Sequence, residues 1–326
     1  MTFYQLEKAT IFEKAISLVL NEGYRFYHGG VTVSTWIAMK RNKMAYIFLL
    51  PWFILFAVFS VYPLIQSFIY SFHDVKILRG EMEFVGLDNY TNLFQDPVFG
   101  RALINTFIYV VGTIPFTVSI ALLLALAVNQ RIPFKNFFRV GFFLPTVTSI
   151  IVVSMMFNFM YSPSGFLNMV LNVFNLPTMN WLMDTRTALA SLMGLSVWMS
   201  CGFYMLIFLA GLQSIPKDLY EAATVDGASR IKQFWHVTMP HIRQIAIVVI
   251  VINTINTFQV FPEVYTLTSG GPLNSTTTIV FFLYEQAFRQ FQFGPASATA
   301  YVLFVIIMGV SLLMLKIMGI NKGVGD

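Results

Sequence analysis

Residues 219–240 read L-Y-E-A-A-T-V-D-G-A-S-R-I-K-Q-F-W-H-V-T-M-P and form a charged island between two apolar runs. The flanking runs, about 188–213 and 245–262, contain no Asp, Glu, Lys or Arg. A helix needs roughly 20 mostly apolar residues to cross a bilayer. The pattern therefore predicts two membrane-spanning helices that are joined by a short polar loop.

The composition of the whole chain also indicates a membrane protein. Of its 326 residues, 57% are hydrophobic and 11% are charged, and the mean hydropathy is +0.70. A soluble domain carries about 25% charged residues. The net charge of +5 does not indicate nucleic-acid binding, because the basic residues lie beside the apolar runs rather than in one patch.

Six charge-free stretches are long enough to be spans, and the expected fold class is an all-α integral membrane protein. They cover about 45–72, 102–128, 140–161, 188–213, 245–262 and 295–315.

The distribution of Lys and Arg predicts the orientation of these spans. With the N-terminus inside, 15 of the 20 basic residues lie in cytoplasmic segments, as the positive-inside rule requires. The chain is then N-in and C-in, and the island at 219–240 is cytoplasmic.

The chain ends are expected to flank a six-span domain at 45–318. Residues 1–44 lack the features of a signal peptide and are predicted to form a cytoplasmic extension with an amphipathic helix on the inner membrane surface. A loosely ordered tail is the alternative. Residues 319–326 are expected to be a cytoplasmic tail.

The island itself has the features of a helix-turn-helix over residues 216–242. Pro216 suits the first turn of a helix, and Gly227 permits a sharp turn. Asp226 or Ser229 is expected to cap the second helix, which Pro240 should end near Thr238. The expected apolar face consists of Leu219, Ala222, Ala223, Phe234 and Val237.

The spacing within this island resembles the coupling loop of ATP-binding-cassette (ABC) importer permeases. The family pattern is E-A-A, a Gly six residues after the Glu, and then I-x-L-P. Glu221, Ala222, Ala223, Gly227 and Pro240 match it. Val237 and Met239 replace the usual Ile and Leu. The resemblance implies a type I permease fold in which this loop contacts an ATPase subunit, with Glu221, Ala222, Ala223, Asp226, Gly227, Phe234 and Pro240 as the coupling residues.

Three further segments resemble the carbohydrate branch of that family. They are F-V-G-L-D-N-Y at 84–90, D-P-V-F at 96–99, and L-T-S-G-G-P at 267–272 followed by three threonines at 276–278. The whole chain is also similar to a permease subunit of a bacterial alginate-oligosaccharide importer. An acidic substrate should attract basic groups, however, and no basic residue lies deep in an expected span.

The resemblance implies partners for this chain in a bacterial inner membrane. They are an ABC ATPase dimer, a second permease subunit, an extracytoplasmic solute-binding protein, a carbohydrate substrate and membrane lipid. The chain has no G-x-x-x-x-G-K-[ST] phosphate loop, so ATP hydrolysis is expected in the separate ATPase, which would bind ATP and Mg²⁺. No metal, cofactor or catalytic site is expected in this chain.

Polar residues of the fifth expected span are candidates for a substrate pathway, because polar groups inside spans are often functional. These are Asn253, Asn256, Thr257 and Gln259. Family positions that contact sugar fall near Asn253, Thr257 and Val260, and on the fourth span near Met199, Ser200 and Phe203. Hydrogen bonding between helices is the competing interpretation.

Two acidic residues, Glu263 and Glu285, lie near the expected outer face, where solvation is the favoured interpretation over gating or partner binding. The competing functional class is an ATP-independent secondary transporter or channel. That class predicts buried charges and inverted repeats, and the sequence shows neither.

Overall fold

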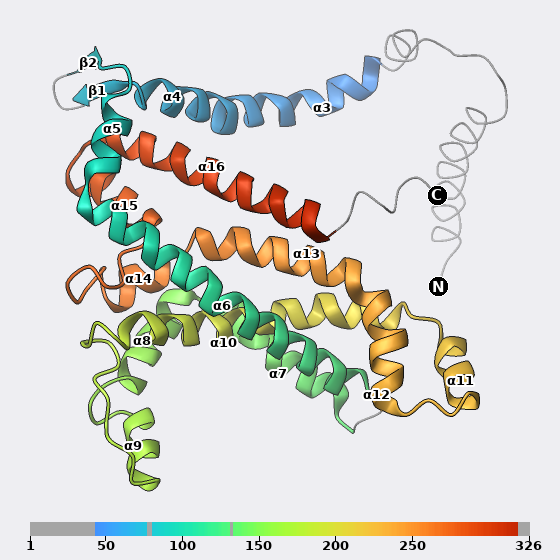
Figure 1. Ribbon diagram of the computed structural model, residues 1–326. Coiled ribbons are helices and arrows are strands. Elements are labelled where there is room, and N and C mark those ends of the chain that lie inside the picture. The colour runs from blue at the N-terminus through green and yellow to red at the C-terminus, as the bar shows by residue number, and fades with distance from the viewer. Residues whose placement is uncertain (1–42, 77–79, 131–132, 319–326) are drawn as a thin grey trace, which may run out of the picture. The chain divides into compact units, whose positions relative to one another are not determined.

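The computed structural model describes residues 43–76, 80–130 and 133–318, so the expected amphipathic helix and C-terminal tail lie outside the described residues. The chain divides into two units, residues 1–64 and 65–326. In the first unit, α3 (Lys43–Phe56), the π-helical turn η1 (Ala57–Val61) and the start of α4 (Tyr62–Tyr70) form one continuous helix (Figure 1). Its apolar side chains are exposed, as expected for a span whose environment is lipid.

The second unit begins with a small hairpin and the longest helix. Strands β1 (His73–Lys76) and β2 (Glu81–Phe84) pair antiparallel, with His73 opposite Phe84. After α5 (Asp88–Gln95) comes α6 (Pro97–Asn129). The Asp96 carboxylate accepts a hydrogen bond from the Val98 N–H at 2.7 Å, and Pro97 occupies the first turn. The D-P pair therefore starts the helix, about five residues before the expected span.

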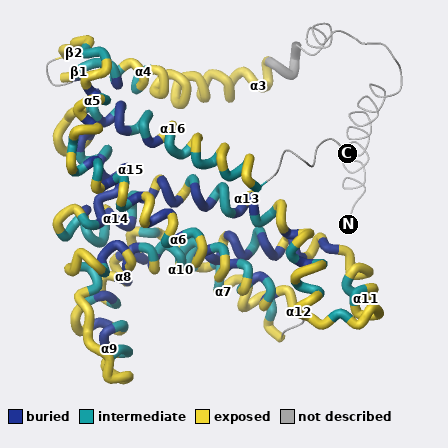
Figure 2. The backbone as a smooth tube through the Cα atoms, in the orientation of Figure 1, coloured by how far each residue is buried: buried dark blue, intermediate teal, exposed yellow. Residues whose placement is uncertain are grey.

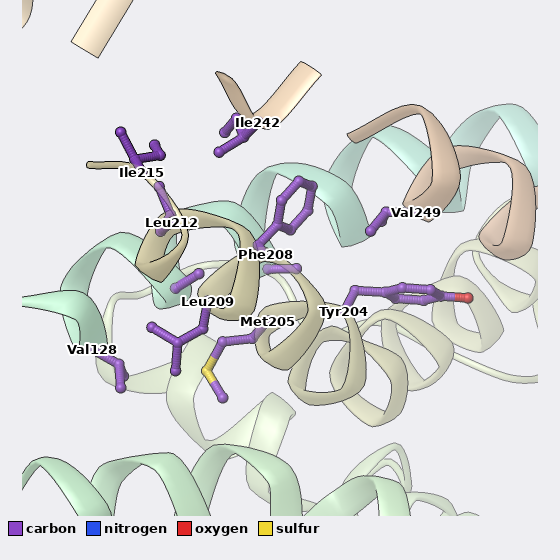
Figure 3. Packing of buried hydrophobic residues seen from close by; sticks show 11 residues of the cluster. Val128, Tyr204, Met205, Phe208, Leu209, Leu212, Ile215, Ile242 and Val249 are labelled. Carbon is purple, nitrogen blue, oxygen red and sulfur yellow. The ribbon is translucent and has the colours of Figure 1, made fainter. Parts of the chain in front are cut away.

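The core of the second unit forms around α10 (Ala188–Gln213), which packs against α6, α7 (Lys135–Val147) and α13 (Met239–Phe258). Figure 2 shows the buried positions collected along these helices. Phe208, Leu209 and Met205 of α10 meet Ile242 and Val249 of α13 in the largest apolar cluster (Figure 3).

Small residues allow the helices of this core to approach closely. A Cβ atom at Gly202 of α10 would overlap the backbone of Phe142 on α7, and one at Gly211 would overlap the Ile245 side chain. On α6, Ala121 and Ala125 are fully buried in the same cluster. Close contacts between small residues are the usual basis of helix association in membranes, where the hydrophobic effect contributes little.

The third expected span, 140–161, is not one straight helix. It is a pair, α7 and α8 (Ile150–Met160), that bends by 97°. Pro145 lies in the last turn of α7 and has no N–H for the helical ladder, and Thr148 adopts an extended backbone conformation. The proline is the physical reason for the break, and the apolar run alone did not reveal it.

The remaining elements complete the unit. Apart from the helices of the loop at 216–242, they are α9 (Phe166–Val173), α14 (Pro262–Leu267), α15 (Ile279–Tyr284), the π-helical turn η4 (Glu285–Arg289) and α16 (Phe293–Met318). The G-G-P turn is held against α6, because Asn105 Nδ2 donates to the carbonyls of Asn274 and Thr277 at 2.9 and 3.0 Å. Arg101 Nη1 donates to the Leu273 carbonyl at 3.1 Å. This segment is therefore an ordered turn.

The described residues form a helical membrane protein. Five helices are long and apolar enough to cross a membrane, and the bent pair makes up to six. The five cover Ile47–Tyr70, Pro97–Asn129, Ala188–Gln213, Arg230–Phe258 and Phe293–Met318. Each overlaps one of the expected spans.

Candidate functional site

A polar cavity of about 320 Å³ lies between α10, α13, the α7–α8 bend and the start of α14. It is lined by Thr146, Ile150, Ser196, Met199, Ser200, Phe203, Tyr204, Asn253, Asn256, Thr257, Gln259, Val260, Pro262 and Glu263. All eight residues predicted for a substrate pathway from the fourth and fifth spans are in this lining. The fold thus brings residues from two separate helices to one cavity.

Asn253 is a buried polar residue of α13 with unused hydrogen-bonding capacity. Its side chain is 2% exposed, and its Oδ1 accepts a hydrogen bond from Thr257 Oγ1 at 3.2 Å. Its Nδ2 has no partner among the described residues. A buried amide that donates no hydrogen bond costs about 1–3 kcal/mol, which a ligand oxygen could recover.

The α10 side of the cavity combines aromatic rings with a hydroxyl network. Asn256 Nδ2 donates to the Tyr204 hydroxyl at 3.2 Å, which joins α13 to α10. The rings of Phe203 and Tyr204 meet edge to face, with centroids 5.3 Å apart. Ser200 donates to the Ser196 carbonyl at 2.6 Å, so its hydroxyl proton is used within the helix. Tyr204 and Ser196 also line the cavity.

The α7–α8 bend adds Thr146 and Ile150, which sequence reasoning missed. Thr146 Oγ1 donates to the Met199 carbonyl at 2.8 Å and thereby fastens the bend to α10. Pro145 was the signal that could have located this wall, because a proline near the end of an apolar run predicts a break.

The expectation that Glu263 is solvated is wrong. Its side chain lies in the first turn of α14, is 7% exposed and lines the cavity. The backbone leaves α13 at Gln259, and α14 then carries Glu263 back against the bundle. Glu263 lies beyond the end of the membrane-crossing helix, at Phe258. Burial raises the pKa of its carboxyl. Glu285, in contrast, is partly exposed and pairs with Arg289 at 2.7 Å.

The second candidate site is the loop at 216–242, at the opposite end of the second unit from the β1–β2 hairpin (Figure 1). It contains α11 (Lys217–Val225), α12 (Arg230–Gln233) and the π-helical turn η3 (Phe234–Thr238). Gly227 has a φ of +73°, which a residue with a side chain adopts only under strain, and it forms the turn between the helices. Ser229 caps α12 by accepting from the Lys232 N–H at 3.4 Å.

Pro240 does not end the second helix, contrary to the prediction. The helix runs without interruption from Arg230 through η3 and α13 to Phe258, over 29 residues. The π-helical turn changes the hydrogen-bonding register just before the proline, so that the missing proline N–H falls in the first turn of α13. The loop is consequently continuous with the helix that carries Asn253.

The expected apolar face of the loop divides into two parts. Val237 packs against the core of the second unit, and Phe234 is half-buried. The Tyr220 hydroxyl lies 2.9 Å from Thr238 Oγ1 and links α11 to η3. Leu219 is 38% exposed, and the most exposed large apolar residues of the loop are Val225, Ile231 and Trp235, at 87%, 73% and 60%. Glu221 and Ala222 are also exposed, and sequence reasoning had overlooked the three apolar residues beside them.

Together, these features define a membrane transport component, with a polar cavity between apolar helices and a helical loop at one end of the bundle. The chain belongs to the family described as binding-protein-dependent transport system inner membrane component, whose model matches residues 98–318.

Its relatives are permease proteins of ABC transporters. It is 37% identical to the probable ABC transporter permease protein YurN of Bacillus subtilis, covering 87% of this chain and 99% of the relative. It is also 37% identical to the arabinooligosaccharides transport system permease protein AraP of the same organism, over 90% and 94% of the two chains. The chain is accordingly a transport subunit rather than an enzyme.

A solved structure of a bacterial ABC transporter involved in import of the acidic polysaccharide alginate contains a chain of similar fold. The TM-score is 0.78 at 25% identity, over 90% of this chain and 99% of that one.

Proposed function

We propose that this chain is a permease subunit of an ATP-driven importer that moves a sugar or oligosaccharide across the bacterial inner membrane by alternating access. The observation that carries the proposal is the cavity at Asn253. It combines an unpartnered amide donor, further amides and aromatic rings. Sugars present hydroxyl groups and apolar ring faces, which such a lining complements. The sugar-transport names of relatives such as AraP support the same substrate class.

The loop at 216–242 is proposed to couple this cavity to an ABC ATPase dimer, which would bind ATP and Mg²⁺. Val225, Ile231 and Trp235 are exposed apolar residues of the same loop as Glu221, and exposed apolar residues on a loop are candidates for protein contacts. By the family resemblance, Glu221, Ala222, Ala223, Asp226, Gly227, Phe234 and Pro240 would belong to this contact. The basic residues of the loop and of α7 favour a cytoplasmic position, and with it N-in and C-in topology.

A second permease subunit and an extracytoplasmic solute-binding protein would complete the importer. An apolar groove of about 590 Å³ supports the first of these partners, because it is open at the surface between α7, α10 and α13. It is lined by Phe143, Phe203, Leu206, Ile207, Ala210, Gly211, Ser214 and Ile245. A helix of a partner permease fits such a groove. The binding protein would deliver sugar at the end that carries the hairpin and α14.

Alginate oligosaccharide is the second candidate substrate. The similarity in fold to the alginate importer favours it. A structure of an alginate transporter with a bound periplasmic protein, at 26% identity and a TM-score of 0.76, points in the same direction. Alginate and a neutral oligosaccharide differ in charge, which the cavity lining can distinguish.

The test is to tag this chain in its native host, extract the complex in mild detergent and identify co-purifying proteins by mass spectrometry. The expected result is recovery of an ATPase with a phosphate loop and of a second permease. Recovery of the chain alone, together with sugar transport in liposomes without ATP, would contradict the proposal and favour a secondary transporter.

A further inference from the structure

The cavity has a distinctive charge. Of the residues that line it, only Glu263 is ionisable near neutral pH, and no Lys, Arg or His is among them. The other polar groups are hydroxyls and amides. A bound molecule would therefore encounter one negative charge with no positive charge to balance it.

The Glu263 carboxyl forms no ion pair within the described part of the chain, and its hydrogen bond is with its own backbone N–H. No described side chain donates a hydrogen bond to it, and both ion pairs between described residues involve other acids. The phenol of Tyr109, on α6, is an ionisable group on a neighbouring helix that interacts electrostatically with Glu263. Burial raises the pKa of the Glu263 carboxyl, and a hydrogen bond with its own backbone N–H acts in the opposite direction and favours the charged form.

A buried, unpaired carboxylate discriminates between sugars by charge. It accepts strong hydrogen bonds from the hydroxyl donors of a neutral sugar. It repels the carboxylate of a uronic acid, because two like charges a few ångströms apart repel each other more strongly inside a protein than in bulk water. At the effective dielectric constant of a protein interior, this repulsion weakens binding on the order of 100-fold.

We propose that Glu263 is a specificity-determining residue that makes this cavity accept uncharged sugars and exclude sugar acids. The inference rests on the proposed sugar-import function and selects the neutral oligosaccharide over alginate. Asn253 and Glu263 divide the task, because the amide donates to sugar oxygens and the carboxylate accepts from sugar hydroxyls.

The test measures sugar binding to the purified permease–ATPase complex without its binding protein, so that the membrane cavity alone selects. The probes are radiolabelled neutral trisaccharides (arabinotriose, maltotriose and galactotriose) and the anionic trigalacturonate. In the native complex, at least one neutral trisaccharide should bind about 100-fold more tightly than trigalacturonate. Glu263→Gln should reduce this ratio at least tenfold, and Glu263→Asp should preserve it.

Glu285→Gln is the matched control, because Glu285 is an acid near the same end of the unit whose charge lies outside the cavity lining. Its ratio should equal that of the native complex. Equal or tighter binding of trigalacturonate, or an unchanged ratio in a monodisperse Glu263→Gln complex, would overturn the charge selection and leave the importer proposal intact. Failure of every probe to bind would contradict the proposed sugar function itself, and with it this inference.

Discussion

At the scale of single residues, Asn253 and Thr254 are adjacent and buried on α13, but their side chains differ in hydrogen bonding. The Asn253 Nδ2 lacks a partner within the described chain and lies at the cavity. The Thr254 hydroxyl donates to the Ile250 carbonyl at 2.7 Å and faces Met314 of α16. Asn253 therefore keeps an unused donor next to the cavity, whereas the Thr254 hydroxyl is used within the helix bundle.

Asn253→Ala should weaken apparent sugar affinity, since the amide N–H groups that it removes satisfy no other group. Within the fold it removes one hydrogen bond, from Thr257 Oγ1 to Asn253 Oδ1. The expected increase in the half-saturating sugar concentration is about tenfold, the value of one hydrogen bond of about 1.4 kcal/mol. Uptake kinetics in whole cells measure it. Thr254→Val is the control and should leave sugar affinity unchanged. Equal affinities for Asn253→Ala and the native protein would assign Asn253 to helix packing instead.

The polar residues within an apolar run predict which helix face lines the cavity, but they do not predict which residues close its ends. Asn253, Asn256 and Thr257 could be found from sequence, because helical spacing places them on one face. Glu263 could not, since its burial depends on how α14 turns back after Gln259. No local pattern encodes that turn.

At the scale of helices, the packing of α10 on α7 depends on the absence of a side chain at Gly202. Gly202→Ala should separate these helices and lower stability by about 1–3 kcal/mol, as overpacking does elsewhere. Thermal unfolding in detergent, followed by size-exclusion chromatography, measures the loss. Gly309→Ala on α16 is the control, because a Cβ there meets nothing within 4 Å. A native-like midpoint for Gly202→Ala would disprove the close approach.

The loop at 216–242 depends on the conformation of Gly227. Proline requires a negative φ, so Gly227→Pro should distort the turn and release the ATPase from the tagged chain while leaving membrane insertion intact. Glu221→Lys should abolish uptake by reversing the charge of the contact, with the ATPase still bound. Quantitative recovery of the ATPase and sugar uptake are the two measurements.

Gly80→Pro provides the matched control for the turn. Gly80 also has a positive φ, of +67°, and open space around it, but it belongs to the β1–β2 hairpin at the other end of the unit. This variant should retain the ATPase. Normal uptake in both Gly227→Pro and Glu221→Lys would refute the coupling role.

Apolar runs predicted the helices well, because length and composition largely decide which segments can cross a bilayer. They failed where a proline changed the path of the chain. Pro145 divides the third expected span, whereas Pro240, expected to end a helix, lies inside a continuous one after a π-helical turn. The effect of a proline depends on its position in the helical hydrogen-bonding register.

At the scale of the whole molecule, one helix connects the two candidate sites. The 29 residues from Arg230 to Phe258 run from the loop to Asn253, Asn256 and Thr257 at the cavity. A continuous helix transmits movement along its length, so displacement of the loop by an ATPase would move the cavity lining directly. The continuity of α12, η3 and α13 gives a physical basis for the proposed alternating access.

The most direct test of this account is sugar uptake by proteoliposomes that contain the complete complex purified through this chain, with the solute-binding protein on the outside. The account predicts that uptake requires ATP and Mg²⁺ on the side of the loop, and that Glu221→Lys abolishes it while the complex remains monodisperse. Undiminished uptake without ATP would contradict the central claim that the loop couples an ATPase to the cavity.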